Sequence, residues 1–125
     1  MRLKAPLMAL IAAAVAIATT AHSEGDLKQG EAVYKKSCLI CHAVEAGKNK
    51  IGPSMHGIVG KKSATVEGFQ YSPAMKNADK TWDAKTLDEY LANPRDYIPN
   101  TKMVFPGLKD EGDRRNLITY LESLK

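Results

Sequence analysis

The chain is poor in the residues and patterns that build several common kinds of protein. Its 125 residues include only two cysteines, three histidines and one tryptophan. No segment alternates apolar and polar residues for long, so strand signals are weak and an all-α domain is expected. The basic excess is small, and no aromatic stacking pattern interleaves the lysines, which argues against nucleic-acid binding.

The chain also lacks an apolar run long enough to span a bilayer. Arg2 and Lys4 precede an apolar run of twelve residues, 7–18, followed by TTAHSEG, whereas a spanning helix needs about 20. This pattern is typical of a secretory signal peptide. We expect cleavage after Ser23, with Ala21 as second choice, so that 1–23 is a leader and 24–125 is one domain. No permanent membrane anchor is expected. No cysteine stands directly after the cleavage site, where a lipid would be attached.

The charge of the domain is unevenly distributed along the chain. Residues 35–62 carry six lysines and one glutamate, whereas residues 63–100 carry four basic and six acidic side chains. Such an asymmetry favours a basic face that steers an acidic partner.

Helices are predicted at both ends of this domain. In GDLKQGEAVYKK, Asp26 can cap a helix that places Leu27, Gly30 and Tyr34 on one face. Glycine inside a helix costs about 1 kcal/mol relative to alanine, so Gly30 indicates close approach of another helix. The last helix offers the partner, because its apolar residues follow the spacing i, i+3, i+4, i+7 at Leu117, Tyr120, Leu121 and Leu124. The two terminal helices are therefore expected to cross.

Two further helical segments and two long loops lie between them. TWDAKTLDEYLANP predicts a helix that stops at Asn93 before Pro94 and buries Leu87, Tyr90 and Leu91. In YSPAMKNA, Ser72 can cap a turn of helix that begins with Pro73. Residues 44–62 and 93–110 are rich in Pro, Gly, Asn and Lys. Long loops of this kind in a compact domain are expected to wrap a large flat ligand.

The segment SCLICHAV, 37–44, holds both cysteines and a histidine. A redox dithiol belongs at a helix start in a βαβ setting, which is absent here. A structural zinc needs four Cys or His ligands, and the domain has only Cys38, Cys41, His42 and His56, two of them adjacent. The spacing C-x-x-C-H is the attachment signal for a c-type haem, with both thiols bonded to the porphyrin and His42 bound to iron. Covalent haem is the favoured interpretation.

A second axial ligand would complete the iron site. Met103 is the favoured candidate, because it lies in a far loop between IPNTK and VFPG whose prolines and glycine fix its path. His56, Met75 and an open position stay as alternatives. Met55 follows the His42 segment too closely to reach the opposite face.

These stretches resemble a known family. From Gly25 to Lys125, the chain resembles the small soluble class I c-type cytochromes, bacterial electron carriers that include relatives of mitochondrial cytochrome c. The resemblance rests on CLICH, GPSMHGIVGKK, GFQYSPAMKN, TWDAKTLDEYLANPRDYIPNTKM and NLITYL. It implies a small all-α cytochrome c fold, with crossed terminal helices and long loops wrapping one covalently bound haem.

The resemblance also implies roles for individual residues. Cys38 and Cys41 would form the thioethers, and His42 and Met103 would be the axial ligands. Pro53 would accept a hydrogen bond from His42 through its carbonyl, which orients the ring. The remaining pocket residues would be Tyr71 and Trp82 near a haem propionate, Tyr90 and Thr101 near the methionine, and Phe105 near the haem edge.

The implied function is non-enzymatic, one-electron transfer in the periplasm. The protein would be a monomer that docks transiently with a redox protein donor and acceptor, using a partial basic ring of Lys36, Lys50, Arg95 and Lys109. The alternatives are a haem subunit fixed in a larger oxidoreductase complex and a haem enzyme or gas binder with an open site. Departures from the family pattern occur at Lys61, Asn100 and Ser37, where relatives often have arginine, glycine and lysine.

Overall fold

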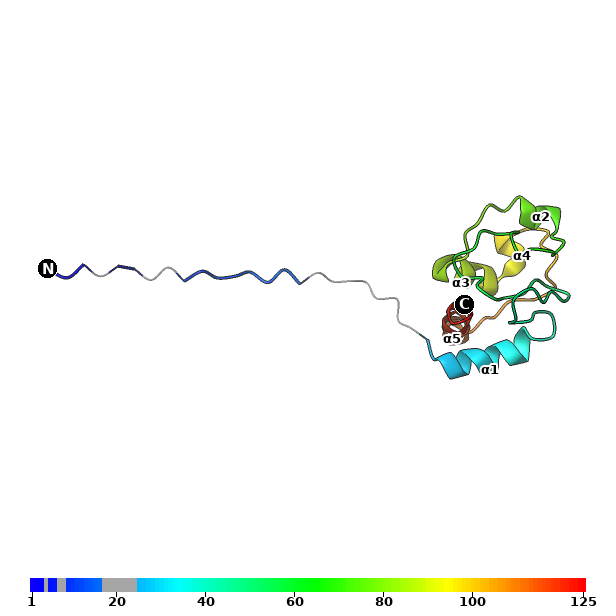
Figure 1. The fold of residues 1–125 in the computed structure, drawn as a ribbon, viewed down its shortest axis with the longest axis horizontal. Coiled ribbons are helices and arrows are strands. Elements are labelled where there is room, and N and C mark those ends of the chain that lie inside the picture. The colour runs from blue at the N-terminus through cyan, green and yellow to red at the C-terminus, as the bar shows by residue number, and fades with distance from the viewer. Residues whose placement is uncertain (4, 7–8, 17–24) are drawn as a thin grey trace.

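The computed structural model describes residues 1–3, 5–6, 9–16 and 25–125. Residues 25–125 contain the helices α1 (Leu27–Ser37), α2 (Pro73–Lys76), α3 (Ala84–Ala92), α4 (Pro94–Tyr97) and α5 (Glu111–Glu122), as Figure 1 shows. Within that range the only β pairing is an isolated bridge between Lys62 and Thr81. The all-α prediction is therefore confirmed.

Part of the predicted leader, 1–23, lies outside the described residues. Both proposed cleavage positions, Ser23 and Ala21, lie outside the described residues. No helix found in the described ranges combines the length and the apolar character needed to cross a bilayer.

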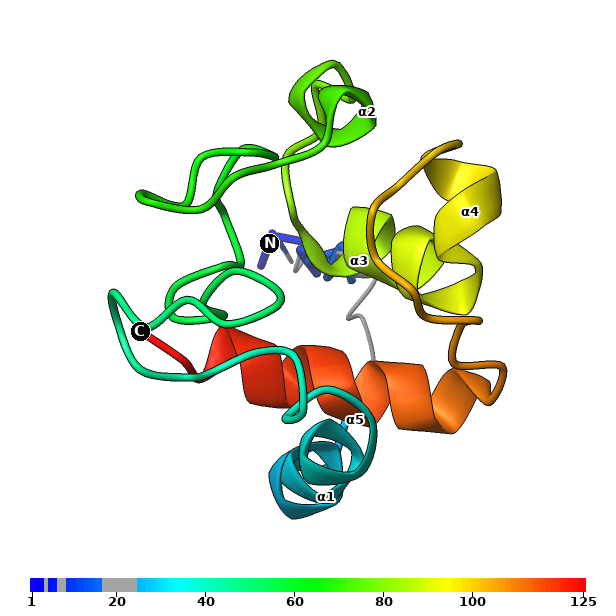
Figure 2. The ribbon, with the colours of Figure 1, turned by 90° about the vertical axis from the view of Figure 1, so that its right-hand side faces the viewer.

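Helix α1 begins where the sequence predicts and packs directly on α5. The Asp26 carboxylate accepts a hydrogen bond from the Gln29 amide at 2.8 Å, which caps the first turn. Figure 2 shows α1 end-on beneath α5, so the two helices cross steeply. Gly30 is buried at the crossing, where a methyl group would overlap the backbone carbonyl of Asn116. Leu27, the first helical residue on the same face, lies at its edge and is 50% exposed.

Helix α5 buries a broader face than the sequence pattern predicts. Asp110 caps it by accepting a hydrogen bond from the Asp113 amide at 2.8 Å. Leu117 and Leu121 are buried as predicted, and Ile118 joins them, because α5 packs against both α1 and α3. Tyr120 and Leu124 are half-buried at the edges of this face.

Helix α3 confirms its predicted bounds, whereas the loop after it contains a helix that the prediction missed. Asp83 and Thr86 form a reciprocal capping box, and Leu87, Tyr90 and Leu91 are buried. The chain leaves the helix at Asn93, but the Asn93 side chain then accepts a hydrogen bond from the amide of Asp96. Asn93 thus ends one helix and caps the next, the single turn α4, which opens with Pro94.

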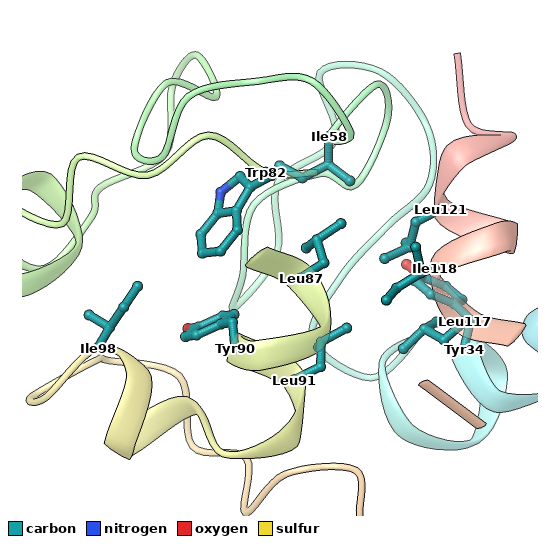
Figure 3. Close-up of a cluster of buried hydrophobic side chains, with 10 residues drawn as sticks. All are labelled: Tyr34, Ile58, Trp82, Leu87, Tyr90, Leu91, Ile98, Leu117, Ile118 and Leu121. Atoms are coloured by element: carbon teal, nitrogen blue, oxygen red, sulfur yellow. The ribbon is translucent and has the colours of Figure 1, made fainter. Parts of the chain in front are cut away.

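The buried residues form two groups joined by α3. In Figure 3, Trp82, Tyr90 and Ile98 lie on one side, and Tyr34 lies with the α5 residues on the other. Leu87 and Leu91 lie between the groups. The rings of Trp82 and Tyr90 are packed with centroids 5.1 Å apart. The two leucines of α3 therefore connect both groups into one core.

One loop residue is strained by its backbone conformation, and relieving the strain should stabilise the fold. Ala64 has a φ of 60°, in the left-handed region that costs a residue with a Cβ atom roughly 1–2 kcal/mol. We expect Ala64→Gly to raise the free energy of unfolding by about 0.5–1 kcal/mol, after the greater unfolded-state entropy of glycine is subtracted. Thermal unfolding of the holoprotein measures this as a melting temperature about 2–8 °C higher.

The control for this prediction is Ala46→Gly, at another loop alanine. Ala46 is not among the residues with positive φ, so glycine there brings only the entropic cost and should lower the melting temperature. Equal destabilisation by both substitutions would show that the Ala64 conformation stores no strain.

Candidate cofactor site

An apolar cavity of about 320 Å³ is lined by residues of α1, α3 and α5 and of the loops between the helices. Its volume falls in the range of small-molecule and cofactor sites, roughly 300–1,000 Å³. All ten residues that the sequence analysis assigned to the cofactor line it: Cys38, Cys41, His42, Pro53, Tyr71, Trp82, Tyr90, Thr101, Met103 and Phe105. Positions up to 67 residues apart in the sequence thus meet around one cavity.

The two thiols are placed by a tight turn at the end of α1. Cys38 caps the helix, its amide donating to the Tyr34 carbonyl at 2.8 Å. The amides of Cys41 and His42 both donate to the Cys38 carbonyl, at 3.1 and 3.0 Å. This turn brings both sulfur atoms and the imidazole to the cavity wall.

The surroundings of these thiols also bear on the three chemistries that the motif allows, which are a redox dithiol, a structural zinc site and haem attachment. Burial raises the pKa of the Cys38 thiol to about 11, whereas redox-active cysteines have a lowered pKa. Among the described residues, no group of three or more His, Cys, Asp or Glu side chains could hold a metal ion. Within the part of the chain that the structure describes, the site therefore lacks the lowered Cys38 pKa of a redox dithiol and the ligand set of a structural zinc.

The imidazole of His42 is oriented by the loop that faces it. Its Nδ1 atom lies 2.8 Å from the Pro53 carbonyl oxygen, and because a carbonyl only accepts, Nδ1 carries the proton. The lone pair is then on Nε2, the atom left free to bind a metal. Gly52 lies against the ring so closely that a methyl group would overlap it. Burial lowers the pKa of His42, which keeps the ring neutral and able to coordinate.

Met103 lies in the loop between α4 and α5, directly after a tight turn. The Thr101 amide donates to the Ile98 carbonyl at 3.1 Å, and Asn100 takes a φ of 65° within that turn. Asparagine tolerates this left-handed conformation better than most residues, which explains why it can stand where relatives often have glycine. The Tyr90 hydroxyl lies 2.9 Å from Thr101 Oγ1 and 3.9 Å from Met103 Sδ.

The other candidates for the second ligand are placed differently. Met55 and Met75 also line the cavity, but Met55 follows Pro53 on the loop that holds His42. His56 is not among the lining residues, and its amide donates to Ser54 Oγ at 3.2 Å.

Phe69 and Tyr71 line another part of the cavity. The Val66 amide donates to the Tyr71 hydroxyl oxygen at 3.1 Å, so the hydroxyl proton stays available for a further acceptor. The sequence analysis missed two residues here. Lys102 Nζ lies 5.2 Å from the ring centroid of Phe69 and donates to the Gln70 carbonyl at 3.1 Å. No local pattern signals this contact, because it joins segments 32 residues apart.

The rim of the cavity carries exposed apolar side chains, and the predicted basic docking residues are exposed elsewhere on the surface. Ile40, Ile51 and Val104 line the cavity, yet they are 78%, 72% and 88% exposed. The four predicted docking residues, Lys36, Lys50, Arg95 and Lys109, are also exposed. Two of them have backbone partners, since Lys50 Nζ donates to Leu39 O at 2.5 Å and Lys109 Nζ donates to Ala92 O at 2.8 Å.

The two remaining departures from the family pattern also have defined positions. Lys61 Nζ donates to the His56 carbonyl at 3.3 Å, within the loop that begins after His42. Ser37 is the last residue of α1 and lines the cavity.

A helical domain whose loops enclose an apolar cavity, with C-x-x-C-H at its wall, defines a c-type haem protein. Residues 27–125 match the family described as Cytochrome c, and the chain belongs to that family. It accordingly binds one covalent haem c, with Cys38 and Cys41 in the attachment motif, and it is an electron-transfer protein rather than an enzyme.

Individual relatives agree with this assignment. The chain is 52% identical over 99 residues to "Cytochrome c type-1" of Ascaris suum, covering 79% of this chain and 88% of that protein. It is 52% identical over 98 residues to "Cytochrome c 2.1" of Caenorhabditis elegans, covering 78% and 88%. It is 48% identical over 99 residues to "Cytochrome c" of Nigella damascena, covering 78% and 89%. These relatives come from eukaryotes, so membership of the family is confirmed but a specifically bacterial origin is not.

Proposed function

We propose that this protein is an exported one-electron carrier of the bacterial periplasm, in which His42 and Met103 are the axial ligands of the haem iron. The observation that carries the proposal is that both thiols, the imidazole and the thioether line one apolar cavity. When bound, the haem supplies an Fe(II)/Fe(III) couple that takes up or releases a single electron. The protein residues hold the iron, exclude water and present the site to partners.

The proposed ligand pair is supported by how each side chain is held. His42 has its Nδ1 proton committed to Pro53 O at 2.8 Å, which leaves Nε2 for the iron. Met103 has the Tyr90 hydroxyl beside its sulfur at 3.9 Å and follows the turn at Asn100. His42 lies in a loop that precedes α3 in the sequence, and Met103 lies in a loop that follows it. Each ligand can therefore be oriented independently of the other.

Export is supported by the leader pattern, and the family match begins at residue 27, just after the expected cleavage position. We expect the periplasmic fraction to contain a chain that begins at Glu24 and carries the mass of one haem. Intact-protein mass spectrometry after osmotic shock measures both features. Retention of 1–23 on a cytoplasmic product would contradict the proposed location.

The rim of the cavity supports transient docking to a redox protein donor and acceptor. Exposed Ile40, Ile51 and Val104 offer a small apolar contact. The exposed basic side chains of Lys36, Lys50, Arg95 and Lys109 accelerate encounter with an acidic partner. We expect a monomer whose second-order rate constant falls as salt rises, because salt screens exposed charges. A complex that survives high salt would instead indicate a subunit fixed in a larger oxidoreductase.

An occupied sixth position distinguishes a carrier from a gas binder or haem enzyme. Because the proposed Met103 thioether fills that position, carbon monoxide added to the reduced protein should leave the visible spectrum unchanged near neutral pH. A rapid spectral change would mean that the position is open and would contradict the carrier assignment.

Removing the Tyr90 hydroxyl should lower the midpoint potential. The hydroxyl is placed to donate to Met103 Sδ at 3.9 Å, which draws electron density from the sulfur and disfavours the more positive ferric iron. A difference of about 0.5–1 kcal/mol between oxidation states corresponds to about 20–40 mV for one electron. We expect Tyr90→Phe to lower the potential by this amount in a redox titration.

The control for this prediction is Tyr97→Phe, a tyrosine whose ring centroid is 6.1 Å from that of Tyr90 and which does not line the cavity. Its potential should equal that of the unmodified protein. A potential that rises in Tyr90→Phe would show that the hydroxyl does not act on the sulfur as argued.

A further inference from the structure

Tyr34 places a single polar atom inside the helix crossing, and that atom has a specific partner. The side chain is 1% exposed, and its ring centroid lies 5.4 Å from that of Tyr120 on α5. Its hydroxyl donates to the backbone carbonyl of His42 at 2.7 Å. The aromatic ring without its hydroxyl would fill the same space in the crossing, so packing does not explain the hydroxyl.

The backbone around His42 is held from two sides. The carbonyl of Cys41 accepts from the Gly52 amide and that of Ala43 accepts from the Met55 amide, both at 2.8 Å. The intervening carbonyl of His42 accepts from Tyr34 instead, and within residues 25–125 this is its only hydrogen bond. The loop 52–55 therefore fixes one side of this segment, and a single hydroxyl from α1 fixes the other.

The same loop also supplies the contacts to the ring of His42. Pro53 O accepts from Nδ1, and Gly52 lies against the ring. Without the Tyr34 hydroxyl, these contacts with the loop 52–55 would remain, but the part-buried His42 carbonyl would lose its hydrogen-bond partner. Such a carbonyl is costly, and the backbone would be expected to rotate toward another donor.

We propose that Tyr34 is a positioning residue, whose hydroxyl ties the backbone of His42 to the crossing of α1 and α5 and so fixes the orientation of the imidazole at the haem iron. The inference rests on the proposed role of His42 as an axial ligand. Burial raises the pKa of Tyr34, so its hydroxyl keeps its proton and remains a donor across the neutral range.

The test is Tyr34→Phe in the intact holoprotein, followed by proton NMR of the ferric state. Ring protons of an iron-bound histidine and the haem methyl groups carry large hyperfine shifts that depend on the orientation of the imidazole. We expect these resonances to move in Tyr34→Phe. The lost hydrogen bond should also lower the melting temperature by about 4–8 °C.

Two control variants separate positioning from packing. Tyr120→Phe removes the same atom from the neighbouring ring. Ile118→Val weakens the core of α5 and should lower the melting temperature by a comparable amount. Both controls should leave the hyperfine shifts of His42 and the haem methyl groups unchanged. Equal resonance positions in Tyr34→Phe and the two controls would overturn the inference and leave Tyr34 as a core residue only.

Failure of the inference about Tyr34 can be distinguished from failure of the proposal that His42 is an axial ligand. If His42 does not bind iron, its ring protons will lack hyperfine shifts in the unmodified protein itself. Should Tyr34→Phe fail to accumulate, the unmodified protein still decides the matter. A slowly exchanging Tyr34 hydroxyl proton, coupled to the His42 carbonyl carbon, supports the inference, and a rapidly exchanging proton without that coupling overturns it.

Discussion

Replacing both Cys38 and Cys41 with alanine should leave a chain that is largely unfolded. Apolar side chains from the helices and the loops line a cavity of about 320 Å³. If that volume stayed empty, the cost would be on the order of 8 kcal/mol at about 24 cal/mol per Å³. This cost is comparable to the whole stability of a typical domain, about 5–15 kcal/mol. The long loops 44–62 and 93–110, which line the cavity, would then lose the surface on which they pack.

Circular dichroism of the double variant lacking haem measures this loss as the disappearance of most of the helical signal. The single variant Cys38→Ala is the matched control, because one remaining thioether can still retain the haem, and it should keep its helicity. Helicity equal to that of the unmodified protein in the haem-free double variant would show that the domain folds without its cofactor.

Replacing Met103 with alanine should have the largest effect on the redox chemistry. A thioether ligand stabilises ferrous iron, so its loss should lower the midpoint potential by on the order of 0.1–0.3 V, within the roughly 0.8 V that axial ligation spans. The position freed by the substitution should also allow carbon monoxide to bind to the reduced protein. A redox titration and a visible spectrum under carbon monoxide measure the two effects.

Met75→Ala is the matched control for Met103→Ala, since Met75 lines the same cavity and is also half-buried. Its potential should change little, and it should not bind carbon monoxide. If Met75→Ala or the corresponding Met55 variant reproduced the loss and Met103→Ala did not, the assigned ligand would be wrong.

Local sequence signals predicted the elements that frame the site. Asp26 and Ser72 each cap the helix that follows, because short polar side chains satisfy the first free amides wherever they occur. Gly30 correctly indicated a close helix contact, since only a residue without a side chain fits against Asn116. The attachment motif could also be predicted from the sequence, because its chemistry needs Cys38, Cys41 and His42 at fixed spacing.

Features that depend on contacts between distant segments could not be predicted in this way. Helix α4 was missed because a single turn lacks periodicity, although Asn93 and Pro94 carry its capping signal. The burial of Ile118 depends on α5 contacting two helices at once. The hydroxyl of Tyr34 meets the His42 carbonyl only after the chain has turned at the end of α1.

The resemblance located the pocket residues more completely than physical reasoning did. Pattern and spacing alone left His56 and Met75 as alternatives to Met103, because nothing local distinguishes a ligand from a core methionine. The structure brings Met103 beside the Tyr90 hydroxyl and leaves His56 off the cavity wall. Met103 reaches the cavity through the path of the loop after α4, in which Asn100 forms a turn.

The central claim is that an imidazole and a thioether from two loops hold the iron of one covalently attached haem. The most direct test is the visible spectrum of the ferric protein, in which sulfur bound to iron gives a weak band in the far red. We expect this band in the unmodified protein and in Met75→Ala, and its absence in Met103→Ala. A ferric protein that lacks the band, or a Met103→Ala variant that keeps it, would contradict the claim.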